Sequence, residues 1–208
     1  MSSRPSRKTA SNSSSLRIIG GEWRGRRLQF PEIEGLRPTP DRVRETLFNW
    51  LMPVIAGARC LDLFAGSGAL GLEALSRGAA SVTFVDLSRQ VKQSIEANLA
   101  LLKTNRARVY ASDALSWTQQ APAEQFDILF LDPPFRKQML TACCETLEAR
   151  GMLAPGAYIY IEAEEELTRL IVPGTWRLHR HQRAGQVQYA LFIRDANATA
   201  PKPETTQA

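Results

Sequence analysis

The sequence predicts an α/β fold: a seven-stranded, mostly parallel β-sheet with helices on both faces. From Ala58 onward, short apolar runs of strand length alternate with amphipathic runs of helix length, as in sheets whose parallel strands are joined by helices. A glycine-rich loop lies between the first of these strands and its helix. Near the end of the chain, "TWRLHRHQRAGQVQYALFIR" reads as two strands around Gly185, which predicts an antiparallel pair at the edge of the sheet.

The N-terminal elements are expected to form an extension of this fold. The segment "LRIIGGEWRGRRLQF" predicts a β-hairpin with Gly20 and Gly21 as its two-residue turn. "DRVRETLFNWL" has helical periodicity, and Asp41 is its expected N-cap. The predicted divisions are a disordered tail over 1–15, an N-terminal hairpin and helix over 16–52, the main domain over 53–194 and a polar tail over 195–208.

The elements of the main domain follow from hydrophobic periodicity and from glycines. Gly78 is expected just beyond the end of the first helix, where a left-handed glycine often stands. A short turn is expected between the third and fourth strands. The expected strands are residues 58–64, 81–86, 107–111, 126–131 and 157–162, and the expected helices are 69–77, 88–102 and 137–149.

The charge of the chain is concentrated near its N-terminus. Residues 1–44 hold 10 of the 26 Lys and Arg but only 4 of the 21 Asp and Glu. A cationic segment on an otherwise neutral domain indicates a polyanionic partner, with nucleic acid ahead of an anionic membrane and a solubilising tail as the remaining alternative. No apolar run approaches the ~18 residues that a membrane span needs.

The three cysteines have neither disulfide nor metal-ligand spacing. Cys143 and Cys144 are adjacent on an expected helix, and Cys60 lies in an expected strand. Such cysteines are typical small core residues, so we expect a reducing cytoplasm and no metal site.

The glycine-rich loop indicates a bound nucleoside. "CLDLFAGSGALGLEAL" contains G-x-G-x-x-G, and Asp86 follows at the end of the next strand, as in dinucleotide-binding folds. Asp62 precedes the loop, however, and its carboxylate would repel a pyrophosphate but suits a cationic ligand. S-adenosylmethionine has a sulfonium, an ammonium group and a ribose, but no phosphate. The expected cofactor-binding residues are Asp62, Phe64, Ala65, Gly66, Gly68, Asp86, Asp113 and Ala114.

The stretch "ILFLDPPF" predicts the chemistry. Asp132 ends the fourth strand and therefore faces the same crevice as the other strand-end acids. Its carboxylate and the carbonyl of Pro133 could hold an exocyclic base amine while nitrogen becomes tetrahedral. Pro134 keeps the chain stiff, and Phe135 offers a ring for a flipped base to stack on. The expected reaction is direct in-line methyl transfer with no covalent enzyme intermediate.

These motifs resemble known methyltransferases. "DLFAGSGALG" with "DPPF" resembles the class I S-adenosylmethionine-dependent amino methyltransferases. More closely, "RIIGGEWRGRRLQFP", "LRPTPDRVRETLFNWL" and "LDLFAGSGALGLEALSRGA" look like the bacterial 16S rRNA guanine-N2 methyltransferase family of the RsmD type, over about Leu16 to Arg194. The resemblance implies a Rossmann-like class I methyltransferase fold and N2 methylation of a guanine in small-subunit rRNA, with S-adenosylhomocysteine as the other product.

The resemblance also implies roles for N-terminal residues. Thr39 and Arg42 would border the methionine carboxylate of the cofactor, although Arg42 and Arg44 could instead only pair with Glu45 or cap the sheet. The implied partner is 16S rRNA, naked or within the assembled subunit, with a monomeric enzyme and no membrane. The arginines expected to grip RNA phosphates are Arg17, Arg24, Arg26 and Arg27.

Other readings remain open at this point. DNA adenine-N6 and cytosine-N4 methyltransferases share the DPPF chemistry, and a non-catalytic nucleic-acid-binding module could keep the same fold. A nicotinamide oxidoreductase is disfavoured by Asp62. His179 and His181 alternate on an expected edge strand and are interpreted as surface residues.

Overall fold

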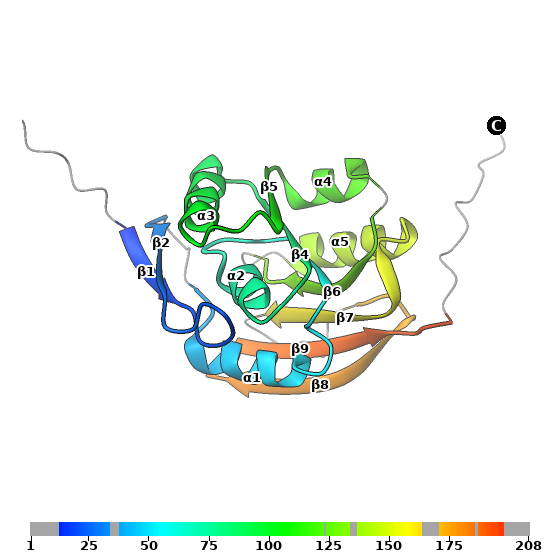
Figure 1. The fold of residues 1–208 in the computed structure, drawn as a ribbon. Coiled ribbons are helices and arrows are strands. Elements are labelled where there is room, and N and C mark those ends of the chain that lie inside the picture. Colours follow the sequence, from blue (N-terminus) through cyan, green and yellow to red (C-terminus); the bar gives the residue numbers. More distant parts are fainter. Residues whose placement is uncertain are drawn as a thin grey trace, which may run out of the picture.

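A seven-stranded sheet in the order β5-β4-β3-β6-β7-β9-β8 runs through the computed structural model (Figure 1). The structure describes residues 13–33, 38–122, 124–133, 137–163, 171–185 and 187–197. The strands of the sheet are β3 (Arg59–Asp62), β4 (Ser81–Asp86), β5 (Ala107–Ala111), β6 (Phe126–Leu131), β7 (Leu153–Ala163), β8 (Trp176–Ala184) and β9 (Val187–Arg194). The mostly parallel α/β class predicted from the sequence is confirmed.

The strands carry apolar side chains on both faces of the sheet. Helices therefore cover both faces and bury these side chains. On one face, α1 (Asp41–Leu51), α2 (Ala69–Ser76) and α3 (Arg89–Leu101) pack in one core with Phe130 and Tyr160. On the other face, α4 (Ala114–Gln120) and α5 (Lys137–Ala149) pack against Leu129 and Ile159. None of the helices in the described ranges is long and apolar enough to cross a membrane.

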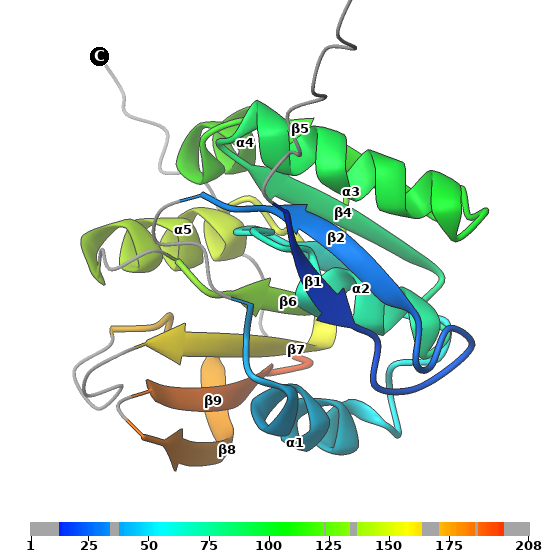
Figure 2. The same ribbon diagram turned by 90° about the vertical axis from the view of Figure 1, so that its left-hand side faces the viewer.

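A separate two-stranded hairpin lies over α2 and α3 (Figure 2). Its strands are β1 (Ser13–Arg17) and β2 (Arg27–Pro31), which pair in antiparallel register. The Gln29 carbonyl accepts hydrogen bonds from Ser94 Oγ (2.9 Å) and Asn98 Nδ2 (2.8 Å), which fix β2 on α3. The hairpin is therefore an additional layer outside α2 and α3, as an N-terminal extension predicts.

The turn predicted at Gly20-Gly21 is wrong. The strands are joined by the longer loop 18–26, and Gly21 instead lies where a Cβ would come 1.9 Å from the Ser76 carbonyl oxygen. This glycine permits close approach to the end of α2, which the hairpin pattern alone does not reveal. Strand β1 also begins within the expected tail, because Ser14 pairs with Phe30.

The predicted antiparallel pair at the edge of the sheet is confirmed: β9 lies between β7 and the edge strand β8, and it runs antiparallel to both. Two further expectations need correction. The short turn expected after β5 contains α4, which begins at the Asp113 cap and is too short to show clear periodicity. Pro40 is the N-cap of α1, so Asp41 is its first helical residue and makes no cap bond. The acidic run Glu164–Glu166, whose sequence is typical of a solvated helix start, lies outside the described residues.

Candidate active site

Four acids follow parallel strands at the same edge of the sheet. Asp62 and Asp86 end β3 and β4, while Asp113 and Asp132 follow β5 and β6. The four strands are neighbours in parallel register, so their carboxyl ends meet at one edge, where open α/β sheets bind ligands. The structure thus brings together the strand-end acids that the sequence singled out.

The glycine loop bends tightly between β3 and α2. Gly68 precedes α2 with φ 76°, a left-handed conformation that favours glycine. The Gly66 amide donates to Asp86 Oδ2 at 2.9 Å, which ties the loop to the end of β4. A Cβ on Gly71 would lie 2.2 Å from Phe84 Cε1, so this third glycine allows α2 to pack closely on the sheet.

Asp62 is buried beneath this loop. Its Oδ2 accepts a hydrogen bond from the Gly71 amide at 3.0 Å, and the residue is 3% exposed. Burial raises its pKa to about 7, against the lowering effect of the Gly71 hydrogen bond and with a smaller raising effect from Asp86. The carboxyl group can therefore gain a negative charge near neutral pH when a cation arrives beside it.

Asp86 and Asp113 have structural partners in addition to any ligand. Besides Gly66, Asp86 accepts from the Ser88 amide at 2.8 Å, so both carboxylate oxygens are held by backbone N–H groups. Asp113 Oδ1 accepts from the Ser116 amide at 2.9 Å and caps α4. Both carboxylates are fixed, half-buried acceptors at the edge of the sheet.

The remaining predicted cofactor residues lie around the loop and before α1. Phe64 is half-buried, and Ala65 and Ala114 are buried. Thr39 is buried just before α1, whereas Arg42 is exposed on that helix.

Asp132 has an acidic neighbour that sequence reasoning missed. Leu131 on β6 pairs with Ile161 on β7, so the next residues, Asp132 and Glu162, follow side by side at the carboxyl edge. Glu162 is buried, and its Oε2 accepts a hydrogen bond from the Tyr160 hydroxyl at 2.8 Å. Glu162 could not be predicted from the sequence, because a single acid within strand β7 forms no motif. Only the strand register reveals its position beside Asp132.

The charge of Glu162 adds to the affinity of Asp132 for a proton. Burial raises the pKa of Asp132 well above its ordinary value, and the charges of Glu162 and Asp62 add to this rise. Burial also raises the pKa of Glu162, although the Tyr160 hydroxyl lowers it. Two close carboxyl groups in a buried setting hold a proton between them more readily than either alone.

Only part of the DPPF motif can be described. Pro133 follows Asp132 and is half-buried, in line with a stiff exit from the strand. Pro134 and Phe135 lie outside the described residues, so their expected roles stay predictions.

The loop arginines do not share the edge of Asp132. In the 18–26 loop, the Glu22 amide donates to the Ser76 carbonyl at the end of α2. Arg26 Nη2 donates to the carbonyl of Leu101, the last residue of α3, at 3.4 Å. Helices that follow parallel strands return to the amino edge, so this loop lies at the edge opposite Asp132.

The other predicted arginines are also surface residues. Arg24 and Arg27 are exposed, and Arg17 Nη2 lies 3.6 Å from Asp41 Oδ2. Their role in RNA binding stays a prediction.

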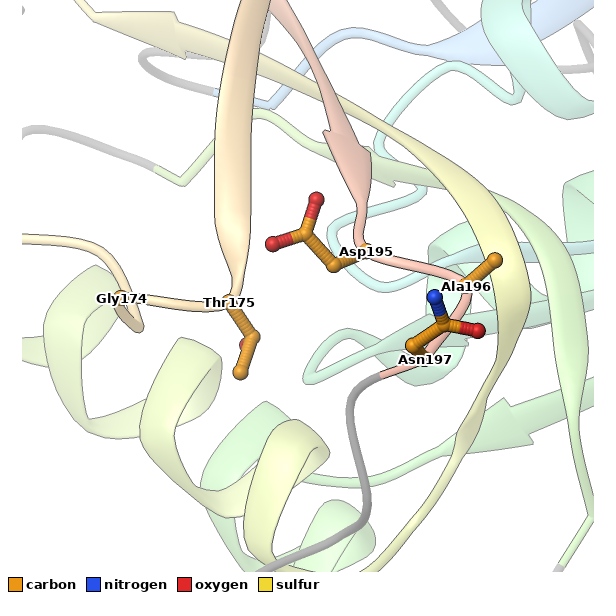
Figure 3. Close-up of a pocket in the computed structure, with 5 residues that line it drawn as sticks. All are labelled: Gly174, Thr175, Asp195, Ala196 and Asn197. Atoms are coloured by element: carbon orange, nitrogen blue, oxygen red, sulfur yellow. The ribbon is translucent and has the colours of Figure 1, made fainter.

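Two surface hollows are distant from the strand-end acids. One lies between the start of β8 and the end of β9 and is lined by Gly174, Thr175, Asp195, Ala196 and Asn197 (Figure 3). The other includes Asp127 and Pro155 at the starts of β6 and β7. Both are at the amino edge and contain none of the predicted site residues. The described ranges hold no cluster of three His, Cys, Asp or Glu that could bind a metal ion.

Comparison with known proteins identifies relatives over nearly the whole fold. The family described as "Conserved hypothetical protein 95" matches residues 16–193. The ribosomal RNA small subunit methyltransferase D of Escherichia coli K12 is 54% identical over 186 residues, covering 89% of this chain and 93% of that protein. The Haemophilus influenzae protein of the same name is 46% identical over 181 residues, covering 85% and 93%. The solved structure of Escherichia coli yhhF has a TM-score of 0.82 and 52% identity, covering 88% of this chain and 99% of that one.

Proposed function

Because this chain belongs to the ribosomal RNA small subunit methyltransferase D family, the RsmD family, we propose that it methylates small-subunit rRNA. The reaction is transfer of a methyl group from S-adenosylmethionine to the exocyclic N2 of a specific guanine in 16S rRNA. The observation that carries this proposal is the row of acids at the carboxyl edge, with Asp132 at the end of β6, in a chain that matches the family from residue 16 to residue 193.

The residues at this edge fit S-adenosylmethionine. Asp62 is a buried acid whose charge is readily stabilised by a cation, and it lies under a loop tightened at Gly68. Asp86 offers fixed carboxylate oxygens suited to ribose hydroxyls, and we assign the carboxylate of Asp113, which caps α4, to the adenine amino group. When bound, the cofactor supplies an electrophilic methyl group on its sulfonium.

Asp132 acts on the target amine. Its carboxylate accepts a hydrogen bond from N2 of guanine, which orients the nitrogen lone pair and stabilises the positive charge that nitrogen gains. After the C–N bond forms and the C–S bond breaks, the extra N–H proton passes to the carboxylate and then to solvent. Pro133 contributes its backbone carbonyl as a second acceptor, and Phe135 stacks on the base.

The substrate class is tested by nucleoside analysis. Purified enzyme is incubated with cofactor labelled in its methyl group and with 16S rRNA that lacks the modification. We expect the label in N2-methylguanosine, and none in a parallel reaction with Asp132→Ala. Label in N6-methyladenosine or N4-methylcytosine would overturn the substrate assignment. Parallel reactions with naked rRNA and with assembled subunits identify the form of the substrate, and light scattering tests the proposed monomer.

A further inference from the structure

The edge strand β8 carries a row of exposed cationic side chains. Every residue from Arg177 to Arg183 is exposed, and the segment 176–194 contains no Asp or Glu. Within the described ranges, no acid forms an ion pair with Arg177, Arg180 or Arg183. Among the described residues, the row is therefore positive and has no acid paired with it.

His179, which lies within this row, is affected by the positive potential of the neighbouring arginines. The His179 ring lies 6.3 Å from the Tyr158 ring in an edge-on contact. Burial, and then the charges of Arg180 and Arg177, lower the pKa of His179. Cations that oppose protonation of a nearby ring also attract anions from solution.

The register of the sheet places one end of this row at the edge that holds Asp132. Gln182 on β8 pairs with Tyr189 on β9, and Tyr189 pairs with Glu162 on β7. Glu162 lies next to Asp132, so Gln182 and Asp132 are separated by three strand spacings, roughly 14 Å. Arg180 lies on the same face of β8 as Gln182, and Arg183 follows Gln182 on the opposite face. Because β8 is the edge strand, a phosphate backbone that runs along its open edge from a base at Asp132 would pass both arginines.

The hairpin loop is less well placed for the same task. Arg26 lies at the C-terminal end of α3, whose 13 residues span about 20 Å from the edge of Asp86. The concentration of positive charge near the N-terminus favoured the hairpin as the RNA-binding element. The fold, however, brings the cationic part of β8 nearer to Asp132.

From these observations we infer that Arg180 and Arg183 on β8 form an RNA phosphate-binding surface beside the methyl-transfer site. The inference rests on the proposed function, because RNA is the polyanion that this site would receive. Guanidinium groups suit phosphate oxygens, and contacts to the backbone position the strand without reading its sequence. Charged residues also protect edge strands from self-association, so the test separates the two roles.

The experiment compares two variants that each lose two positive charges. R180Q/R183Q changes edge strand β8, and K103Q/R108Q changes exposed residues near the opposite edge strand, β5. Binding of unmodified 16S rRNA is measured by fluorescence anisotropy over a series of KCl concentrations. For R180Q/R183Q we expect the slope of log affinity against log salt to become shallower by about 1.5 units. K103Q/R108Q should keep the wild-type slope.

Three results would overturn the inference: an unchanged slope in R180Q/R183Q, an equal change in both variants, or new self-association of R180Q/R183Q with unchanged RNA binding. Calorimetric binding of S-adenosylhomocysteine, expected to be unchanged in both variants, confirms that each retains its fold. Failure of the proposed function can be distinguished from failure of this inference, because the wild-type protein would then not methylate rRNA at all.

Discussion

Arg44 on α1 and Glu73 on α2 form a buried ion pair beneath the N-terminal hairpin. Arg44 Nη1 lies 3.6 Å from Glu73 Oε2, and both side chains are almost fully buried. Glu73 also accepts hydrogen bonds from the amides of Ile19 and Gly20 at 2.8 Å each. The carboxylate therefore joins the hairpin loop to both helices.

We expect Glu73→Ala to lower the free energy of unfolding by about 3–5 kcal/mol, because it removes the buried charge partner of Arg44 and leaves that guanidinium only its pair with the more exposed Asp41 (2.6 Å). Two loop amides would also lose their acceptor. Urea unfolding at pH 7 measures the loss. Asp127→Ala is the control: its pair with Arg59 (3.1 Å) is partly exposed, so its loss should cost about 1 kcal/mol or less. Equal losses in the two variants would contradict the role given to burial.

The second prediction concerns Asp62 and pH. A buried acid whose pKa is raised to about 7 binds a proton more tightly in the folded chain than in the unfolded one, where its pKa is near its ordinary 3.8. Its contribution to stability is therefore complete below about pH 4 and is lost as the pH rises through about 7. Asp62→Asn should remove this part of the decline, measured as the free energy of unfolding between pH 4 and 8. An unchanged decline would show that Asp62 titrates normally.

Cofactor binding gives a separate reading of Asp62. If the positive end of S-adenosylmethionine approaches this group, it favours the charged form, so binding releases a proton below about pH 7. Affinity should then rise with pH up to about 7 in the wild type and stay flat in Asp62→Asn. Calorimetry in buffers of different ionisation enthalpy measures the released proton. We expect Asp62→Asn to bind the cofactor without releasing this proton. Proton release that persists in Asp62→Asn would show that another group gives up the proton.

The parallel strands and the edge of the sheet that holds the acids could be predicted, because alternating patterns and strand-end residues are local in sequence. The hairpin loop could not, because Gly21 is required by contact with Ser76 on another element. Arg44 was ambiguous for the same reason: its partner Glu73 is distant in the chain. Glu162 and the arginine row of β8 became visible only from strand register, which short-range patterns do not specify.

Glu162 should set the pH at which Asp132 becomes active. Glu162 contributes to the raised pKa of Asp132, after burial. Glu162→Gln removes that charge and keeps an acceptor for Tyr160, so the pKa of Asp132 should fall. Because the amine needs a deprotonated Asp132, the rise of the single-turnover rate with pH should move to lower pH. A profile that loses height but does not move would show that Glu162 acts only in packing.

The last prediction tests Asp132 itself. Asp132→Ala should retain cofactor affinity, because the residue follows β6 at the sheet edge and is only half-buried. The methyl-transfer rate should fall by at least ~100-fold, the usual loss when one preorganised partner of the transition state is removed. Asp132→Asn keeps an acceptor oxygen but loses the charge that stabilises the cationic nitrogen, so its rate should lie between those of wild type and alanine. The control is Asp127→Ala, at the other end of β6, which should keep the wild-type rate. Single-turnover rates with saturating 16S rRNA separate chemistry from binding, and near-wild-type transfer by Asp132→Ala would mean that the acid serves only as the end of a strand.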